Sequence, residues 1–458
     1  MQHFDLCVIG SGTGNSLIDE RFAGMKVALV DDGHPFGGTC LNHGCIPTKM
    51  FVYPATLATA VRAAGPLGLH SKDVRLDWDA VRDRIFGRID AIAEAGESYR
   101  AHSENVTLFR ARGKFVGDHK LKAGNKTLTA DQFVIAAGSR PRLPEVPGMD
   151  EMSDRLHTSD TIMRLEELPK SLVIVGGGYI AAEFAAIFAA FGTAVTVIAR
   201  GPSLLRHEDE AVSERFTELV AERVTVRLNQ NLVAFEDSGR ESVLVATTDT
   251  DGVEYSFEGE QVLLALGRTP NTEALNLAAT GVQVDAAHRI IVDDRQRTTA
   301  KGIFALGDIS SQWQLKHVAN AEARVVAHNL LHRRQLKSDH RFVPHAVFSD
   351  PQIAAVGATE QQLKAEGRPY VVAVQDYASV AYGWAMEDTG HFVKLLADKT
   401  TKRLLGAHII GPEASVLIQP LIQAMSFGLD VPSMARGQYW IHPSLAEVVE
   451  NALLGLNL

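Results

Sequence analysis

The same short pattern occurs twice in this chain of 458 residues, and it constrains the fold more than any other feature. In the first copy, an apolar run at residues 4–9 leads into a glycine-rich turn at residues 10–15 and a helical stretch. A second apolar run at residues 26–30 then ends at Asp31. A strand, glycine turn, helix and strand, with an acid about twenty residues after the first glycine, form a dinucleotide-binding unit. Its helix N-terminus holds the pyrophosphate and its acid binds a ribose hydroxyl. Asn15 stands where the third glycine is usual.

The second copy ends differently from the first. Its apolar run at residues 171–175 leads into the turn at residues 176–181, a helix and the strand at residues 194–198. No acid ends this strand; Arg200 and Arg206 follow it instead. Guanidinium groups match a 2′-phosphate by charge and bidentate geometry, whereas a carboxylate suits a free 2′-hydroxyl. We therefore expect the second site to prefer NADPH to NADH, with a pair of solvated surface arginines as the alternative.

Each copy is followed by a further apolar strand that ends in small residues, at residues 132–141 and 261–270. The two halves thus look like one dinucleotide-binding unit used twice, which implies two cofactors that face each other and pass electrons. A third run, at residues 302–308, ends in Asp308. At the end of a strand, this carboxylate could bind sugar or ribityl hydroxyls, or it could cap a turn or helix.

Two of the three cysteines, Cys40 and Cys45, lie close together in the glycine-rich stretch at residues 37–49. Thiols at this spacing can open and close as a disulfide without a change of fold, and the glycines let the backbone pass close to a flat group. The alternatives are a chance pair or a zinc half-site, but zinc needs four ligands and only Cys7 remains. Cys7 lies within the first strand, where we expect a packed core thiol.

Composition argues against several other classes of protein. The net charge of −10 and the pI of about 5.9 make nucleic acid an improbable partner. No run of 18 apolar residues occurs, so we expect no membrane span, and no secretory leader is visible. Three cysteines are too few for a secreted disulfide scaffold. We therefore expect a cytoplasmic protein with a catalytic dithiol.

The last third of the chain has a different pattern. From residue 340 onward, apolar runs at residues 346–348, 392–396 and 404–410 and a helix at residues 413–428 predict an antiparallel sheet with helices. Such a segregated arrangement indicates a domain separate from the doubly wound parts.

Near the end of the chain, His442 precedes Pro443, and Glu447 follows. Proline fits the first turn of a helix, so we expect His442 at the mouth of a helix and Glu447 about one turn on. A carboxylate on one imidazole nitrogen fixes the tautomer and leaves the other nitrogen for proton transfer. The chain has 17 histidines, so this arrangement by itself indicates only a candidate acid–base pair.

The chain strongly resembles one family in four features, taken in order: the first turn, the cysteine stretch, the second turn with Tyr179 and the arginines, and the GIFALGD sequence. This family is the FAD-containing pyridine nucleotide–disulfide oxidoreductases, the group of glutathione reductase and dihydrolipoamide dehydrogenase. The resemblance covers nearly the whole chain. It implies an α/β fold with two Rossmann-like dinucleotide-binding domains and a C-terminal α+β dimerisation domain. The implied domains are FAD-binding (1–144), NADPH-binding (145–268), FAD-binding and central (269–338) and dimerisation (339–458).

The resemblance also implies binding residues, and it implies no metal site. The residues implied to bind FAD are Gly10, Gly12, Gly14, Asp31, Gly38, Thr39, Lys49, Ala137, Gly138, Gly307 and Asp308. Those implied to bind NADPH are Gly176, Gly178, Tyr179, Ile180, Glu183, Arg200, Arg206 and Gly267. By the same likeness, Lys49 and Glu183 form an ion pair near flavin N5, and Tyr179 covers the nicotinamide pocket.

The catalytic roles are likewise implied by the resemblance. Cys45 would face the flavin, and Cys40 would exchange with a small-molecule disulfide. His442, oriented by Glu447, would serve as acid and base in the active site of the other subunit. The resemblance therefore implies a homodimer with shared active sites.

A closer resemblance, to one subgroup of the family, indicates the substrate. It rests on likeness of sequence alone. Four stretches resemble the subgroup that acts on mycothione, the disulfide of an actinobacterial thiol: residues 12–16, 86–90, 381–388 and 435–443. The alternatives are a glutathione-type reductase, a dihydrolipoamide dehydrogenase, or a protein whose flavin serves a structural or sensing role. His43, where valine is usual in the family, is either a harmless exposed residue or a group that tunes the thiols.

Overall fold

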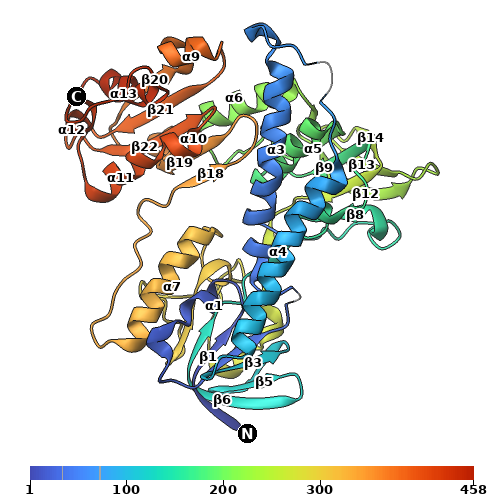
Figure 1. Ribbon diagram of the computed structural model, residues 1–458, viewed down its shortest axis with the longest axis vertical. Coiled ribbons are helices and arrows are strands. Elements are labelled where there is room, and N and C mark those ends of the chain that lie inside the picture. The colour runs from blue at the N-terminus through green and yellow to red at the C-terminus, as the bar shows by residue number, and fades with distance from the viewer. Residues whose placement is uncertain (34, 72–73) are drawn as a thin grey trace.

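The computed structural model describes residues 1–33, 35–71 and 74–458, and it contains the α/β fold that the glycine turns predict (Figure 1). The first unit is built on parallel strands in the order β3-β2-β1-β6-β17. These strands are β1 (Gln2–Ile9), β2 (Val27–Asp31), β3 (Val106–Arg110), β6 (Lys126–Ile135) and β17 (Ile303–Ala305). The second half of β1, residues 6–9, is a continuous buried apolar run because a central parallel strand is covered on both faces. An antiparallel arm, β4 (Gly113–Gly117) and β5 (Lys120–Ala123), pairs with β6.

Helices pack around this sheet, and two of them lead to the second unit. α1 (Thr13–Leu17) and α7 (Lys316–Leu331) pack side by side on one face, where Leu17 and Val326 share a core with β1. α3 (Cys45–Ala63) and α4 (Trp78–Ala101) run together through the centre of the molecule (Figure 1).

An aromatic cluster fixes α3 against the second unit. Phe51 of α3 stacks on Trp78 with ring centroids 5.4 Å apart, and both contact Phe191 of α5 (Tyr179–Phe191). Buried aromatic pairs contribute specific geometry in addition to apolar area. The helix that begins at Cys45 is therefore held by the second unit as well as by the first.

The second unit repeats the first on a smaller sheet. Its parallel strands lie in the order β11-β10-β9-β15-β8. They are β8 (Leu156–His157), β9 (Ser171–Val175), β10 (Ala194–Ile198), β11 (Thr225–Arg227) and β15 (Gln261–Leu264). An antiparallel sheet of β12 (Asn231–Asp237), β13 (Val243–Thr248) and β14 (Glu254–Gly259) adjoins it.

The small-residue ends of the two echoing strands meet each other. β7 (Ser139–Pro141) pairs antiparallel with β16 (Arg268–Pro270), which ties the end of the first unit to the end of the second. Arg268 strengthens this seam, because its guanidinium donates to the side chain and the carbonyl of Ser139, each at 2.7 Å.

The last third forms the predicted antiparallel sheet, seen in orange and red in Figure 1. Its strand order is β18-β19-β22-β21-β20. The strands are β18 (His345–Val347), β19 (Ile353–Gly357), β20 (Val371–Asp376), β21 (Phe392–Ala397) and β22 (Leu404–Ile410). Its helices are α8 (Glu360–Ala365), α9 (Ala381–Ala385), α10 (Ala414–Leu417), α11 (Gln419–Phe427), α12 (Val431–Arg436) and α13 (Ala446–Gly455).

One helix prediction for this part needs correction. The single helix expected at residues 413–428 is divided into α10 and α11, and Pro420 lies in the first turn of α11, where its missing N–H is not needed.

Within the described residues, none of the helices combines the length and apolarity that a membrane crossing requires.

Candidate active site

Cys40 and Cys45 are free thiols at the junction of two helices. Cys40 lies in α2 (Gly38–Asn42) and is half-buried, while Cys45 is the first residue of α3 and is exposed in the chain. Gly38 has a φ of 74°, and a Cβ added there would lie 2.7 Å from the Cα of Gly12. Only glycine therefore lets the dithiol segment approach the first nucleotide turn so closely.

The two thiols have different electrostatic environments. A hydrogen bond from the Cys40 thiol, assisted by the charge of Lys49, lowers the pKa of Cys45 to about 7. The same hydrogen bond, together with burial, raises the pKa of Cys40 above that of a free thiol. The two thiols are therefore unequal, and the lower pKa belongs to Cys45. Cys7, in contrast, is fully buried in β1, and desolvation raises its pKa, as expected of a packed core thiol.

The ion pair expected of Lys49 and Glu183 is formed. The Lys49 Nζ lies 2.8 and 2.7 Å from the two carboxylate oxygens of Glu183, which is buried in α5. The backbone N–H of Phe348 donates to the same carboxylate at 2.9 Å, and the Lys49 Nζ lies 4.8 Å from the Phe348 ring centroid. Phe348 follows β18, so all three parts of the fold meet beside the dithiol.

The two glycine turns have the same construction. Gly10 has a φ of 113° and Gly176 a φ of 142°; in each, a Cβ would lie 2.3 Å from a carbonyl oxygen of the neighbouring strand end. A Cβ on Gly14 would lie 2.9 Å from the Cβ of Ala136. Gly14 thus provides the close helix–strand approach for which the third glycine normally serves. The unusual Asn15 instead accepts from Arg100 Nε of α4 at 2.6 Å.

Asp31 is the last residue of β2, and Asp308 lies in the short 3-10 turn, residues 307–309, that follows β17. The Asp31 carboxylate accepts from the backbone N–H of Ser11, and from that of Gly33 at 2.6 Å, so it also fixes the glycine turn. Asp308 accepts from Ser139 Oγ at 2.6 Å and caps no helix. Asp308 therefore contacts the seam between the two units. It does not cap a helix, which was the alternative role considered from the sequence.

The remaining residues implied for the cofactors lie just after strands or near the starts of helices. Thr39 lies in α2, Ala137 and Gly138 lie between β6 and β7, Gly307 precedes Asp308, and Gly267 precedes β16. Gly178, Tyr179 and Ile180 form the start of α5, and the side chain of Tyr179 is exposed.

Arg200 and Arg206 flank a loop that returns to the second glycine turn. The loop is tied there by the N–H of Leu205, which donates to the carbonyl of Gly177 at 2.7 Å. Both arginine side chains are exposed. The two arginines therefore lie beside the glycine turn, where they could contact a nucleotide bound at that turn, and not at an unrelated place on the surface.

His442 and Glu447 form the expected pair, but not in the expected helix. Nδ1 of His442 lies 2.7 Å from Glu447 Oε1, and this bond lowers the pKa of Glu447. α13 begins at Ala446, so the prediction that Pro443 lies in its first turn is wrong. The reason is that Glu447 also accepts from the N–H of Ser444 at 3.1 Å, which folds the chain into a turn before the helix. Within the described residues of one chain, His442 makes no hydrogen bond to either cysteine.

Two residues, one beside Lys49 and one beside the first glycine turn, were missed because no local motif marks them. Phe348 reaches Lys49 from the third domain, as described above. Lys316, the first residue of α7, donates to Thr13 Oγ1 at 2.7 Å and lines a cavity of about 300 Å³ between α1 and α7.

His43 is half-buried rather than exposed, and its Nδ1 has no partner among the described residues. No group of His, Cys, Asp or Glu in the described ranges is placed to hold a metal ion.

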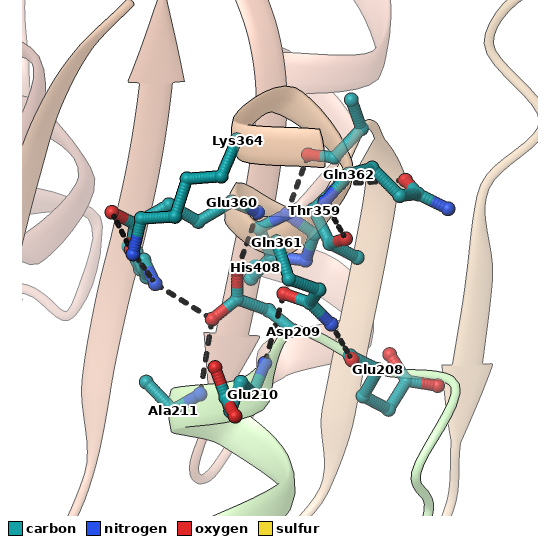
Figure 2. Close-up of polar contacts among 12 residues, drawn as sticks. Glu208, Asp209, Glu210, Ala211, Thr359, Glu360, Gln361, Gln362, Lys364 and His408 are labelled. Carbon is teal, nitrogen blue, oxygen red and sulfur yellow. Dashed lines mark hydrogen bonds and ion pairs between the residues drawn. The ribbon is translucent and has the colours of Figure 1, made fainter. Parts of the chain in front are cut away.

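A buried polar network joins the second unit to the third domain (Figure 2). Asp209, at the start of α6 (Glu210–Ala221), is completely buried and lies 2.7 Å from Lys394 Nζ of β21. Lys394 also lies 2.6 Å from Glu360, whose backbone N–H donates to Asp209 at 2.9 Å. Beside it, His345 of β18 bonds to Glu208 at 2.7 Å. The network thus holds β18, and with it Phe348, in place.

Comparison with known proteins places this geometry in one group. The family described as pyridine nucleotide-disulphide oxidoreductase matches residues 4–323, and its dimerisation domain matches residues 343–453. The chain is 51% identical over 467 residues to mycothione reductase of Mycobacterium tuberculosis, covering 100% of both chains. It is 32% identical to dihydrolipoyl dehydrogenase of Chlamydia muridarum, covering 99% of this chain and 97% of that one. Among solved structures, the HOCl-induced flavoprotein disulfide reductase RclA of Escherichia coli, as its Cu(II) complex, matches with a TM-score of 0.87 and 27% identity, over 99% of each chain.

Proposed function

The chain belongs to the pyridine nucleotide–disulfide oxidoreductase family, and from this premise we propose that it is an NADPH-dependent flavoprotein that reduces mycothione to mycothiol. The observation that carries the proposal is the unequal thiol pair beside the Lys49–Glu183 ion pair, at the meeting point of two dinucleotide units. The choice of mycothione rests on the 51% identity over the full length and on the four stretches of finer likeness.

The first unit fits FAD. The glycine turn at residues 10–14 leaves a cradle that side chains would fill, and Gly12 and Gly38 keep the dithiol segment close to it. Asp31 and Asp308 lie at the strand ends where ribose and ribityl hydroxyls would be bound. FAD held there would supply the two electrons that open the Cys40–Cys45 disulfide. The residues that the resemblance implies for FAD are proposed as its ligands.

The second unit suits NADPH. Arg200 and Arg206 are exposed cations on a loop tied to the glycine turn, which favours a 2′-phosphate over a 2′-hydroxyl. Tyr179, at the start of α5, is proposed to cover the nicotinamide pocket, and Glu183 to hold Lys49 in place beneath it.

The chain's own residues then carry out thiol–disulfide exchange. The Cys40 sulfur forms a bond to one substrate sulfur as the substrate disulfide breaks, and the departing thiolate takes a proton from His442 of the partner subunit. Cys45 next attacks Cys40, which restores the protein disulfide and releases the second thiol. Each turnover thus converts one disulfide and one reduced dithiol into two thiols and one oxidised pair.

This scheme requires a homodimer, because His442 does not reach the thiols of its own chain. The matched dimerisation domain supports one, as do exposed apolar side chains on the third domain: Trp384, Phe427, Tyr439 and Ile441. We also propose a cytoplasmic location, where NADPH-driven reduction of small disulfides has its use.

The test is steady-state oxidation of NADPH against a panel of mycothione, glutathione disulfide and lipoamide. We expect turnover with mycothione to exceed that with the other two clearly, and NADPH to be preferred to NADH. Substituting Arg200 and Arg206 together by Met should raise the KM for NADPH and leave the KM for NADH nearly unchanged. Equal or greater turnover with lipoamide and NADH would refute the proposal.

A further inference from the structure

Arg206, a cation of the loop beside the second glycine turn, depends on its neighbours in the chain for its position. Its side chain is exposed, and in the ranges that the structure describes its guanidinium has no hydrogen bond or ion pair. The residue before it, Leu205, is buried and has a φ of 52°. A bulky residue in this left-handed conformation is strained, and such strain persists only where the surroundings hold the backbone. Contacts of the adjacent backbone therefore set the direction in which Arg206 points.

On the side that precedes Arg206, the loop is held by its own unit. The N–H of Leu205 donates to the carbonyl of Gly177 at 2.7 Å, and the N–H of Leu204 donates to Thr217 Oγ1 of α6 at 3.0 Å. These bonds tie the first half of the loop to the glycine turn and to the helix that follows the loop.

On the side that follows Arg206, the loop is held by the third domain. Nε2 of His345 in β18 lies 2.7 Å from Glu208 Oε1. The Gln361 side chain of α8 donates to the Glu208 carbonyl at 2.8 Å and accepts from the N–H of Glu210 at 3.2 Å (Figure 2). Two side chains of another domain thus fix the backbone and the carboxylate just beyond Arg206.

The Glu208 carboxylate would compete for Arg206 if it were released. Glu208 is 7% exposed, and its second oxygen, Oε2, has no partner among the described residues. His345 is therefore the side chain that holds this carboxylate. A freed carboxylate two residues from Arg206 could reach the guanidinium, which pairs with carboxylates and phosphates in the same bidentate geometry. Loss of the His345 bond would thus weaken phosphate binding in two ways, by loosening the loop and by supplying a competing anion.

We propose that His345 and Gln361 are positioning residues for Arg206, so that the third domain determines how strongly the second unit binds a 2′-phosphate. The inference rests on the proposed function, which assigns NADPH to the second unit and Arg206 to its 2′-phosphate. Both side chains act through the loop, so their effect is confined to nucleotides that carry this phosphate.

The test measures nucleotide binding without turnover. NADP⁺ and NAD⁺, which differ only in the 2′-phosphate and leave the oxidised flavin unreduced, are titrated calorimetrically into the FAD-loaded protein. His345→Leu should weaken NADP⁺ binding by about tenfold, as expected for the loss of one hydrogen bond to a charged group, and leave NAD⁺ binding unchanged. His345→Gln, whose amide can still donate to Glu208, should restore most of the affinity. Gln361→Ala should weaken NADP⁺ binding in the same selective way.

His340→Leu provides the matched control. His340 is also a third-domain histidine paired with a buried glutamate, Glu322 at 3.1 Å, but its partner belongs to α7 of the first unit. The two histidine side chains are equally exposed, at 35% for His340 and 34% for His345. His340→Leu should leave NADP⁺ binding unchanged.

Three results would overturn the proposal: unchanged NADP⁺ binding in His345→Leu, an equal loss of NADP⁺ and NAD⁺ binding, or an equal loss in His340→Leu. A His345→Gln variant as weak as His345→Leu would do the same. If His345→Leu fails to fold, Gln361→Ala decides by the same criteria. A wild type that binds NAD⁺ as tightly as NADP⁺ would refute the NADPH assignment itself, and the inference with it, whereas a wild type that prefers NADP⁺ beside unresponsive variants refutes the inference alone.

Discussion

Replacing Lys394 by Met should destabilise the interface between the second unit and the third domain more than the loss of an exposed ion pair would. Lys394 is 5% exposed and bridges Asp209 and Glu360, whereas Lys364 binds the same Glu360 from the surface at 3.0 Å and is 61% exposed. Removing one partner from a buried pair leaves an uncompensated charge and costs about 3–5 kcal/mol. An exposed pair one helical turn apart contributes only about 0.3–0.5 kcal/mol. Lys364→Met is therefore the matched control.

The assay is the urea unfolding midpoint of the FAD-loaded protein, compared between variants because a chain of several domains need not unfold in one step. Hydrogen exchange of the α6 amides reports the same interface locally. Adding Asp209→Asn to Lys394→Met removes the stranded charge and should recover part of the loss. Equal midpoints for Lys394→Met and Lys364→Met, or a double variant no better than the single one, would refute this reasoning.

The same network predicts a pH dependence. The hydrogen bond from Lys394 lowers the pKa of Glu360 to about 2. A carboxyl group whose folded pKa is depressed stabilises the fold above its unfolded pKa and loses this contribution as the pH falls through the folded value. The stability difference between the wild type and Lys394→Met should therefore be full above about pH 5 and shrink toward about pH 2. A difference that persists undiminished in acid would contradict the assignment.

Three further predictions concern the active site. Cys40→Ser should abolish disulfide turnover while NADPH still reduces the flavin; retained disulfide reduction would remove Cys40 from its role. His442→Ala should slow turnover by about 10²–10⁴-fold with the bound FAD unaffected, and a near-normal rate would count against it. In the reduced protein, the thiolate of Cys45 should appear as the pH rises through about 7, and Lys49→Met should move this titration to higher pH. A titration that does not respond to Lys49 would show that the hydrogen bond from Cys40 alone sets it.

Much of the fold could be predicted because its signals are local. The glycines at 10 and 176 are needed where the chain crosses a neighbouring strand end, and they mark both nucleotide units in the sequence. The strand expected at residues 404–410 has those bounds in the structure, where it lies between β19 and β21 and is buried along nearly its whole length. The proposed domain boundaries and ligand roles stay predictions.

The omissions have a common cause, which is contact between distant segments. The misplaced start of α13 is a local error instead, because a turn in which Glu447 accepts from the N–H of Ser444 precedes the helix. Lys316 meets Thr13 across about two thirds of the chain, and Asp209 meets Lys394 from another domain. No periodicity or spacing encodes such pairs. Their burial and charge become visible only once the chain is folded.

The placement of β17 beside β6 has a consequence for how the protein is made. Residues 133–135 of β6 pair with residues 303–305, which the ribosome produces only after the whole second unit. Until then, this end of β6 lacks its outer neighbour, and an open edge of apolar strand is a site for pairing with another chain. The nascent N-terminal unit therefore depends on a late segment for its protection, and a chain truncated between the second unit and β17 should aggregate even though its first glycine turn is intact.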